Sequence, residues 1–165
     1  VEVFAKQAAA LAEAGVDVLY IETMSDLNEA RAAIEGARLA GPGVPIFATF
    51  SFDHHGRTHM GVRPEQATET LVGLEVDAFG ANCGATLEMT EGAVAKMHAA
   101  APQALLIAKP NAGKPHLVGQ EVVYDATPED MAEYARRFVA LGVRVVGACC
   151  GSNPAHIQAI AKAIT

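Results

Sequence analysis

The sequence predicts an α/β fold with a parallel sheet, arranged as the C-terminal five βα units of a (β/α)8 TIM-type barrel. Three observations predict this fold. Short apolar runs alternate with longer segments of helical character. The apolar runs end 26 to 40 residues apart, which is the length of a βα unit. No Gly-x-Gly-x-x-Gly turn follows any of the runs, which disfavours a dinucleotide-binding fold.

The five apolar runs are predicted to be buried parallel strands. They are rich in Val, Ile, Leu and Phe, which is typical of strands that are covered on both faces. The runs comprise residues 17–22, 44–51, 76–83, 104–109 and 143–149.

The helices between these strands have start and stop signals in the sequence. Thr127 is a predicted N-cap, because Pro128 and Asp130 follow at the first and third helical positions. Gly142 follows the last periodic residue of the same helix and is predicted to end it. The other signals are the pair Asp26 and Glu29, the pair Asn153 and Pro154, and Gly15 after residues 3–14.

The chain is expected to hold only part of a barrel. A complete barrel has eight strands and about 250 residues, whereas this sequence of 165 residues opens with a helix and has five predicted strands. We therefore expect the N-terminal strands to be absent from this chain. Five parallel strands leave two open edges and an uncovered face, so we expect a homo-oligomer or association with the missing N-terminal part.

The composition excludes several classes of function. The residues are 51% hydrophobic and 19% charged, which is enough apolar material for a globular core. The net charge is −7 and no run of five Lys or Arg occurs, so we expect no nucleic-acid partner. No apolar stretch reaches the roughly 18 residues of a membrane span and no signal peptide is visible. We expect no membrane partner and a cytoplasmic location.

Polar residues and all three cysteines stand at the ends of the predicted strands, where barrels carry their chemistry. An odd number of cysteines, two of them adjacent, excludes a disulfide scaffold. Three thiolates at one edge of the sheet suit a zinc ion with its fourth position open, as in catalytic sites. The residues at these ends are Glu22 and Thr23, Ser51 and Asp53, Asn82 and Cys83, Lys109 and Asn111, and Cys149 and Cys150.

Three motifs resemble those of a known family. They are Gly-Ala-Asn-Cys at 80–83, Pro-Asn-Ala-Gly-Lys-Pro at 110–115, and Gly-Ala-Cys-Cys-Gly-Ser-Asn-Pro at 147–154. In this order they resemble the C-terminal motifs of the zinc-dependent homocysteine S-methyltransferase family. That family includes betaine–homocysteine methyltransferase and the homocysteine-binding domain of cobalamin-dependent methionine synthase. The resemblance implies that residues 1–165 form part of a homocysteine-binding domain with a (β/α)8 barrel fold.

The resemblance also implies roles for individual residues. Cys83, Cys149 and Cys150 would be the zinc ligands and the catalytic residues. Glu22 matches the family's strand-end glutamate, which holds the amino group of homocysteine. Asn111 matches the asparagine beside the metal, so it is a second predicted substrate-binding residue.

The implied reaction transfers a methyl group to the thiol of homocysteine, giving methionine. A free thiol with a pKa of about 8.5 is mostly protonated at neutral pH, and coordination to Zn2+ deprotonates it. The methyl donor stays open among methylcobalamin carried by another module, betaine, and a sulfonium such as S-methylmethionine. The partners implied are homocysteine and a methyl donor or donor-carrying domain.

Other interpretations of the same residues stay open. Lys109 at a strand end is compatible with a Schiff-base barrel lyase, which needs no metal. Single buried cysteines are often only small apolar residues, and the chain is also compatible with a non-catalytic fragment that needs its missing half. His54, His55 and His59 form either metal ligands or a solvated loop, and their polar neighbours favour the loop.

Overall fold

The computed structural model describes residues 1–84 and 86–165, which form alternating helices and strands. Each predicted strand is present, and helices lie between consecutive strands as predicted. The elements are α1 (Glu2–Glu13), β1 (Leu19–Met24), α2 (Leu27–Ala40), β2 (Ile46–Phe50), α3 (Pro64–Gly73), β3 (Ala78–Cys83), α4 (Leu87–Ala100), β4 (Leu106–Pro110), β5 (Pro115–Val118), β6 (Glu121–Tyr124), α5 (Pro128–Ala140), β7 (Val143–Val146) and α6 (Pro154–Ile164).

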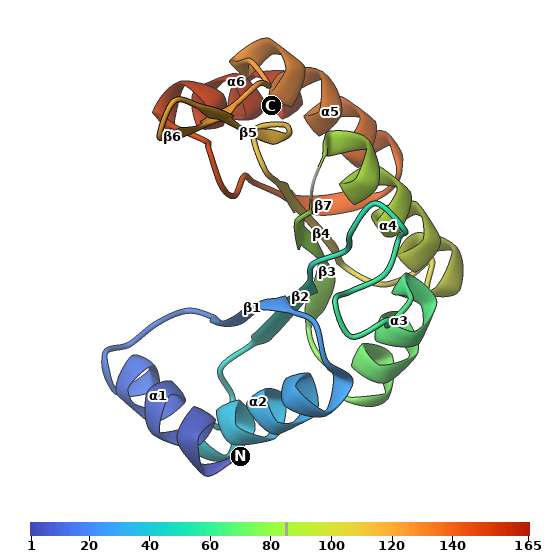
Figure 1. Ribbon diagram of the computed structural model, residues 1–165. Helices are drawn as coiled ribbons and strands as arrows, with labels where there is room; N and C mark the ends of the chain where they lie inside the picture. The colour runs from blue at the N-terminus through green and yellow to red at the C-terminus, as the bar shows by residue number, and fades with distance from the viewer. Residues whose placement is uncertain (85) are drawn as a thin grey trace.

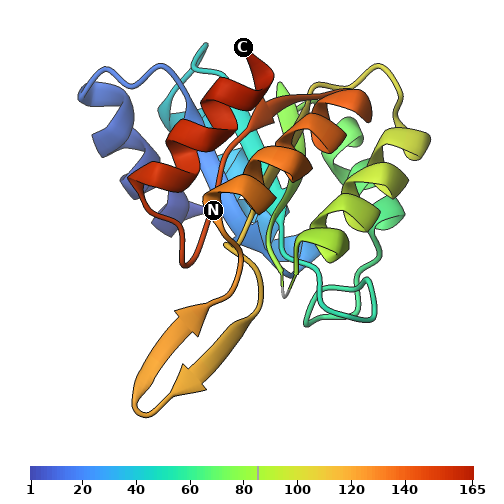
Figure 2. The same cartoon turned by 90° about the horizontal axis from the view of Figure 1, so that it is seen from above.

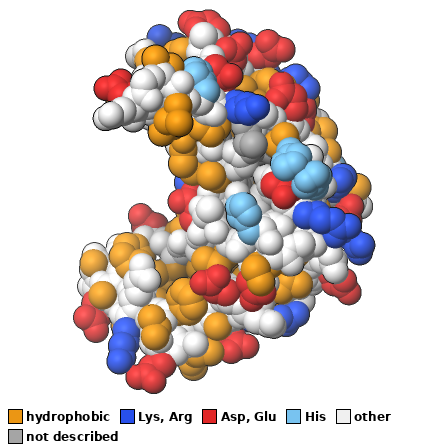
Figure 3. Space-filling view, viewed as in Figure 1, with side chains coloured by type: hydrophobic (Ala, Val, Ile, Leu, Met, Phe, Trp, Pro, Cys, Tyr) orange, Lys and Arg blue, Asp and Glu red, His pale blue; other side chains and the backbone are white. Residues whose placement is uncertain are grey.

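The central sheet is parallel and has the order β1-β2-β3-β4-β7. Its order follows the chain, as in consecutive βα units of a barrel. Figure 1 shows that the sheet curves and that the helices cover its convex face, which leaves a crescent with an open concave side. The space-filling view shows the same side as a hollow (Figure 3). The prediction of a partial barrel is confirmed.

The helix starts are fixed by the capping residues that the sequence indicates. The carboxylate of Asp26 accepts hydrogen bonds from the backbone N–H groups of Asn28 and Glu29, both at 2.9 Å. Thr127 and Asn153 cap α5 and α6 in the same way, each followed by proline. Such caps satisfy the free N–H groups at a helix start. Within the part of the chain that the structure describes, no helix has the length and apolarity needed to span a membrane.

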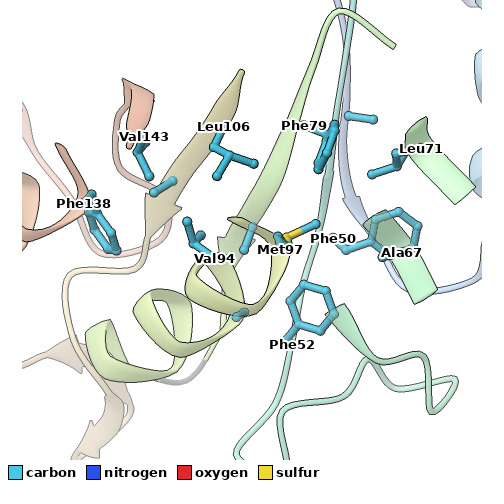
Figure 4. Packing of buried hydrophobic residues seen from close by; sticks show 14 of the residues in the cluster. Phe50, Phe52, Ala67, Leu71, Phe79, Val94, Met97, Leu106, Phe138 and Val143 are labelled. Carbon is cyan, nitrogen blue, oxygen red and sulfur yellow. The ribbon is translucent and has the colours of Figure 1, made fainter. Parts of the chain in front are cut away.

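The core lies between the convex face of the sheet and the helices (Figure 4). Phe50, Phe79 and Leu106 extend from neighbouring strands and pack against Met97 of α4 and Phe138 of α5, and all five are at most 3% exposed. Burying one such side chain stabilises the fold by about 1.5–3 kcal/mol. The core therefore fixes the strands whose ends carry the polar residues.

The last strand differs from the prediction of 143–149, because regular strand geometry ends at Val146. The chain nevertheless continues beside β4. The N–H of Gly147 donates to the carbonyl of Ala108 at 3.0 Å, and the N–H of Cys149 donates to the carbonyl of Pro110 at 2.8 Å. The backbone that leads to the cysteine pair is thus held against β4 up to Cys149.

A β-hairpin between β4 and α5 was not predicted. Strands β5 and β6 pair in antiparallel fashion and form a separate two-stranded sheet, which projects from the body of the molecule (Figure 2). Gly119, with φ of +66°, begins its two-residue turn. A Gly-x dipeptide between two short apolar runs is a hairpin signal, so the sequence contained the information.

Candidate metal centre

The three cysteine thiols lie together at the carboxyl edge of the sheet. Cys83 ends β3, whereas Cys149 and Cys150 lie in the turn after β7, two strands away. Their sulfur atoms all lie within 4.8 Å of one another, and the sulfurs of the adjacent pair are 3.8 Å apart. Within residues 1–84 and 86–165 they form the only group of three or more His, Cys, Asp or Glu with this spacing. The predicted convergence of the three thiols is confirmed.

Asn111 connects the two segments that carry the cysteines. Its side-chain N–H donates to the carbonyl of Gly84 at 2.7 Å, and its side-chain oxygen accepts from the N–H of Cys150 at 3.0 Å. Asn111 is 5% exposed. Cys83 has a φ of +61°, a left-handed conformation that is costly for a residue with a Cβ atom. The bonds of Asn111 hold both the segment after Cys83 and the turn that contains Cys150. Its contact with the substrate stays a prediction.

Asn82 supports the cluster from inside the sheet. This residue is 1% exposed. Its side-chain oxygen accepts from the N–H of Thr23 at 3.0 Å and from the hydroxyl of Thr49 at 2.7 Å. Its side-chain nitrogen donates to the hydroxyl of Thr23 at 2.7 Å and contacts the sulfur of Cys149 at 3.8 Å. One buried amide thus joins the ends of β1, β2 and β3 to one sulfur of the cluster.

The electrostatics of the cluster favour a bound cation. Burial, together with negative charge on Cys83 and Cys150, raises the pKa of Cys149 to about 11. Three thiols in this position therefore resist forming thiolates together without a positive charge. A metal ion removes that penalty, because it deprotonates the thiols that coordinate it. Among common metal ions, zinc is one that binds well to sulfur donors such as these three cysteines.

Glu22 and Lys109 form an ion pair on the concave face of the sheet. The Glu22 carboxylate contacts the Lys109 ammonium, and that ammonium lies 4.7 Å from the centre of the Tyr20 ring. The two charged side chains are 37% and 22% exposed, respectively. Burial raises the pKa of Tyr20 to about 12. The Glu22 carboxylate is partly exposed to solvent, and its charged partner in this structure is Lys109.

The histidines lie apart from the cysteine cluster. His54 and His55 belong to the loop between β2 and α3, with ring centres 3.7 Å apart. The carboxylate of Asp53 organises this loop by accepting from the N–H groups of His55 at 2.8 Å and Arg57 at 3.2 Å. This local turn is the solvated loop that the sequence favours. The described residues bring His54, His55 and His59 into no metal-binding group.

Tyr124 is a residue near the cluster that sequence reasoning missed. It ends β6, and its ring packs against Gly151, the residue after Cys150. Nothing in the sequence of residues 115–124 indicates that the end of this strand reaches the cysteines.

Comparisons with known proteins identify the family. The model of the homocysteine S-methyltransferase family matches residues 1–164. The chain is 32% identical to methionine synthase of Mycobacterium tuberculosis over 170 residues, which cover 99% of this chain and 14% of that protein. Methionine synthase of Mycobacterium leprae is 31% identical over the same length.

Solved structures agree with this result. The metallated homocysteine methyltransferase MmuM from Escherichia coli superposes with a TM-score of 0.77 at 27% identity. The match covers 96% of this chain and 50% of MmuM. A DHDPS from Cyanidioschyzon merolae superposes with a TM-score of 0.54 at 15% identity, which shows a likeness of fold alone. The chain spans about half the length of MmuM and a small part of the methionine synthases, and it belongs to the homocysteine S-methyltransferase family.

Proposed function

We propose that residues 1–165 form part of a homocysteine-binding domain that takes part in methyl transfer to the thiol of homocysteine, giving methionine. The single observation that carries this proposal is the cluster of three cysteine sulfurs within 4.8 Å of one another in a chain of this family. Cys83, Cys149 and Cys150 would hold a zinc ion, and three protein ligands leave one position for the substrate.

The chemistry of homocysteine explains why such a centre is needed. Its thiol is mostly protonated at neutral pH. When bound, zinc supplies the positive charge that keeps a coordinated thiol deprotonated. The residues of this chain hold the three sulfurs in place: Asn111 fixes the turn of Cys150, and Asn82 contacts Cys149. A centre that is fixed before the substrate binds needs little rearrangement during the reaction.

Glu22 is proposed to bind the ammonium group of homocysteine. Glu22 directly precedes Thr23 in β1, and the backbone N–H of Thr23 donates to Asn82, whose side chain contacts the sulfur of Cys149. A substrate held by its thiol at the cysteines and by its ammonium group at Glu22 would be fixed at two points, which orients the sulfur for attack. Lys109 must then share the carboxylate of Glu22 or give it up when the substrate binds.

The Schiff-base alternative has less support. A nucleophilic lysine must be an uncharged amine, whereas Lys109 is ion-paired with Glu22 and lies over the Tyr20 ring, an arrangement that suits an ammonium group.

The proposal is tested by the zinc content of the purified, reduced chain. We expect about one zinc per chain, and its loss in Cys83→Ser. His54→Ala serves as the control, because it should leave the zinc content unchanged. Methionine formation is then assayed with methylcobalamin, betaine and S-methylmethionine as separate donors. A folded and reduced chain without zinc would contradict the proposal, whereas a chain with zinc but without turnover would be the non-catalytic fragment.

A further inference from the structure

The base of the β5–β6 hairpin is held in a defined position. Tyr124 pairs with Pro115, and this residue pair is the one furthest from the hairpin turn. The hairpin base consists of residues 112–114 and 125–126, which flank the two strands. In it, the N–H of Ala126 donates to the carbonyl of Ala112 at 3.0 Å, and the N–H of Lys114 donates to the carboxylate of Asp125 at 2.7 Å. The end of β6 is therefore fixed on both sides.

The same base is bonded to the turn that carries the cysteine pair. The N–H of Ala112 donates to the carbonyl of Cys150 at 2.9 Å. On the other side, the buried imidazole of His156 in α6 lies 3.1 Å from the carbonyl oxygen of Ala126. Hairpin base, cysteine turn and α6 thus form one connected unit, which sets the position of Tyr124 relative to Cys150.

The ring of Tyr124 lies directly against the backbone after Cys150. A Cβ atom added to Gly151 would stand 2.1 Å from Cγ of Tyr124 and 2.6 Å from its Cβ atom, so only glycine leaves room for the ring. Gly151 also has a φ of +77°, which glycine adopts without strain. Burial raises the pKa of Tyr124, and the charges of the nearby Cys150, Cys83 and Cys149 raise it as well. The ring therefore lies beside the turn that carries Cys150, close to the sulfur cluster.

We propose that Tyr124 is a positioning residue of the cysteine centre, whose hydroxyl donates a hydrogen bond to the sulfur of Cys150 and whose ring shields one side of that sulfur. The inference rests on the proposed metal-binding function. Cys150 is the exposed member of the cluster, whereas Cys83 and Cys149 are partly buried. A hydrogen bond to a ligand sulfur draws negative charge away from it and fixes its orientation, and groups of this kind tune a metal site.

The covering role is tested on the metal-free chain by alkylation. Tyr124→Phe and Tyr124→Ala both lack the hydroxyl and differ only in the ring, so their comparison isolates coverage. Each variant is treated with a neutral maleimide, and modification of each cysteine is followed by peptide mass analysis. We expect Cys150 to react severalfold faster in Tyr124→Ala than in Tyr124→Phe, with a smaller change at Cys83. Equal rates at Cys150 would overturn the covering role.

The hydrogen bond is tested with Co2+ as a spectroscopic probe in place of zinc. Loss of the donor makes the Cys150 thiolate a stronger electron donor, so the sulfur-to-cobalt charge-transfer band should move to lower energy in Tyr124→Phe. Val122→Ala is the control, because Val122 lies on the same hairpin face two residues away and is 60% exposed. An unchanged band in Tyr124→Phe would overturn the hydrogen bond. A wild-type chain that binds no Co2+ would count against the proposed function, while the alkylation rates would still decide the covering role.

Discussion

Replacement of Asn82 by alanine is predicted to destabilise the fold and loosen the cysteine centre together. The buried amide makes three hydrogen bonds to Thr23 and Thr49 and contacts the sulfur of Cys149. Thr49 is fully buried, and leaving a buried hydroxyl without its partner costs about 1–3 kcal/mol. The two bonds to Thr23 are more exposed, so we take about 0.5–1 kcal/mol for each.

One term opposes this loss. Thr23 has a φ of +65°, and both of its bonds to Asn82 hold it there. Without the amide, Thr23 can relax, which returns about 1 kcal/mol of backbone strain. The net loss in the free energy of unfolding is therefore about 1–4 kcal/mol.

Urea denaturation of the purified chain measures this loss. Asn28→Ala is the matched control, because Asn28 is exposed in the first turn of α2 and its replacement should change the free energy by no more than about 0.5 kcal/mol. We also expect weaker metal binding in Asn82→Ala, since Cys149 loses its buried neighbour. If Asn82→Ala were as stable as Asn28→Ala, the amide would not be the element that joins β1, β2 and β3.

Three further predictions follow from individual residues. In the metal-free chain the pKa of Cys149 is raised from its ordinary value of 9.0 to about 11. Between these two pH values the folded chain keeps a proton that the unfolded chain releases. The free energy of unfolding should therefore fall as the pH rises from 9.0 to about 11. Urea unfolding across this pH range measures the loss of stability, and a loss of the same size in Cys149→Ala would contradict its assignment to Cys149. Glu22→Gln should raise KM for homocysteine about tenfold or more with a smaller change in kcat, because a charged hydrogen bond to the substrate is lost. An equal rise in KM for a thiol substrate without an amino group would count against the role assigned to Glu22. Gly151→Ala should lose more stability in thermal unfolding than Gly61→Ala, because both have positive φ but only Gly151 lies against the Tyr124 ring; equal losses would show that the ring contact is unimportant.

The parallel sheet and most helix starts could be predicted because their signals are local. Apolar runs identify buried strands, and capping residues such as Asp26 and Thr127 act on N–H groups two or three positions away. The convergence of the cysteines could also be predicted, although Cys83 and Cys149 are far apart in sequence. It needs only the rule that the carboxyl ends of parallel strands share one edge.

The finer parts of the centre depend on tertiary contacts that no local pattern reports. The place of Tyr124 is set by bonds from the hairpin base to Cys150 and to α6. The ion pair of Glu22 and Lys109 forms across strands that are not neighbours in the sheet. The side-chain bonds of Asn111 to backbone on both sides of the cluster likewise follow only from the folded chain.

The most direct test of the central claim is X-ray absorption at the zinc edge of the purified chain, before and after addition of homocysteine. The account predicts three sulfur ligands at about 2.3 Å without substrate and four after homocysteine is added. Cys83→Ser should lose the metal. A sulfur count that stays unchanged when homocysteine is added, in a chain that holds zinc, would contradict the claim that the three cysteines prepare a binding position for the substrate thiol.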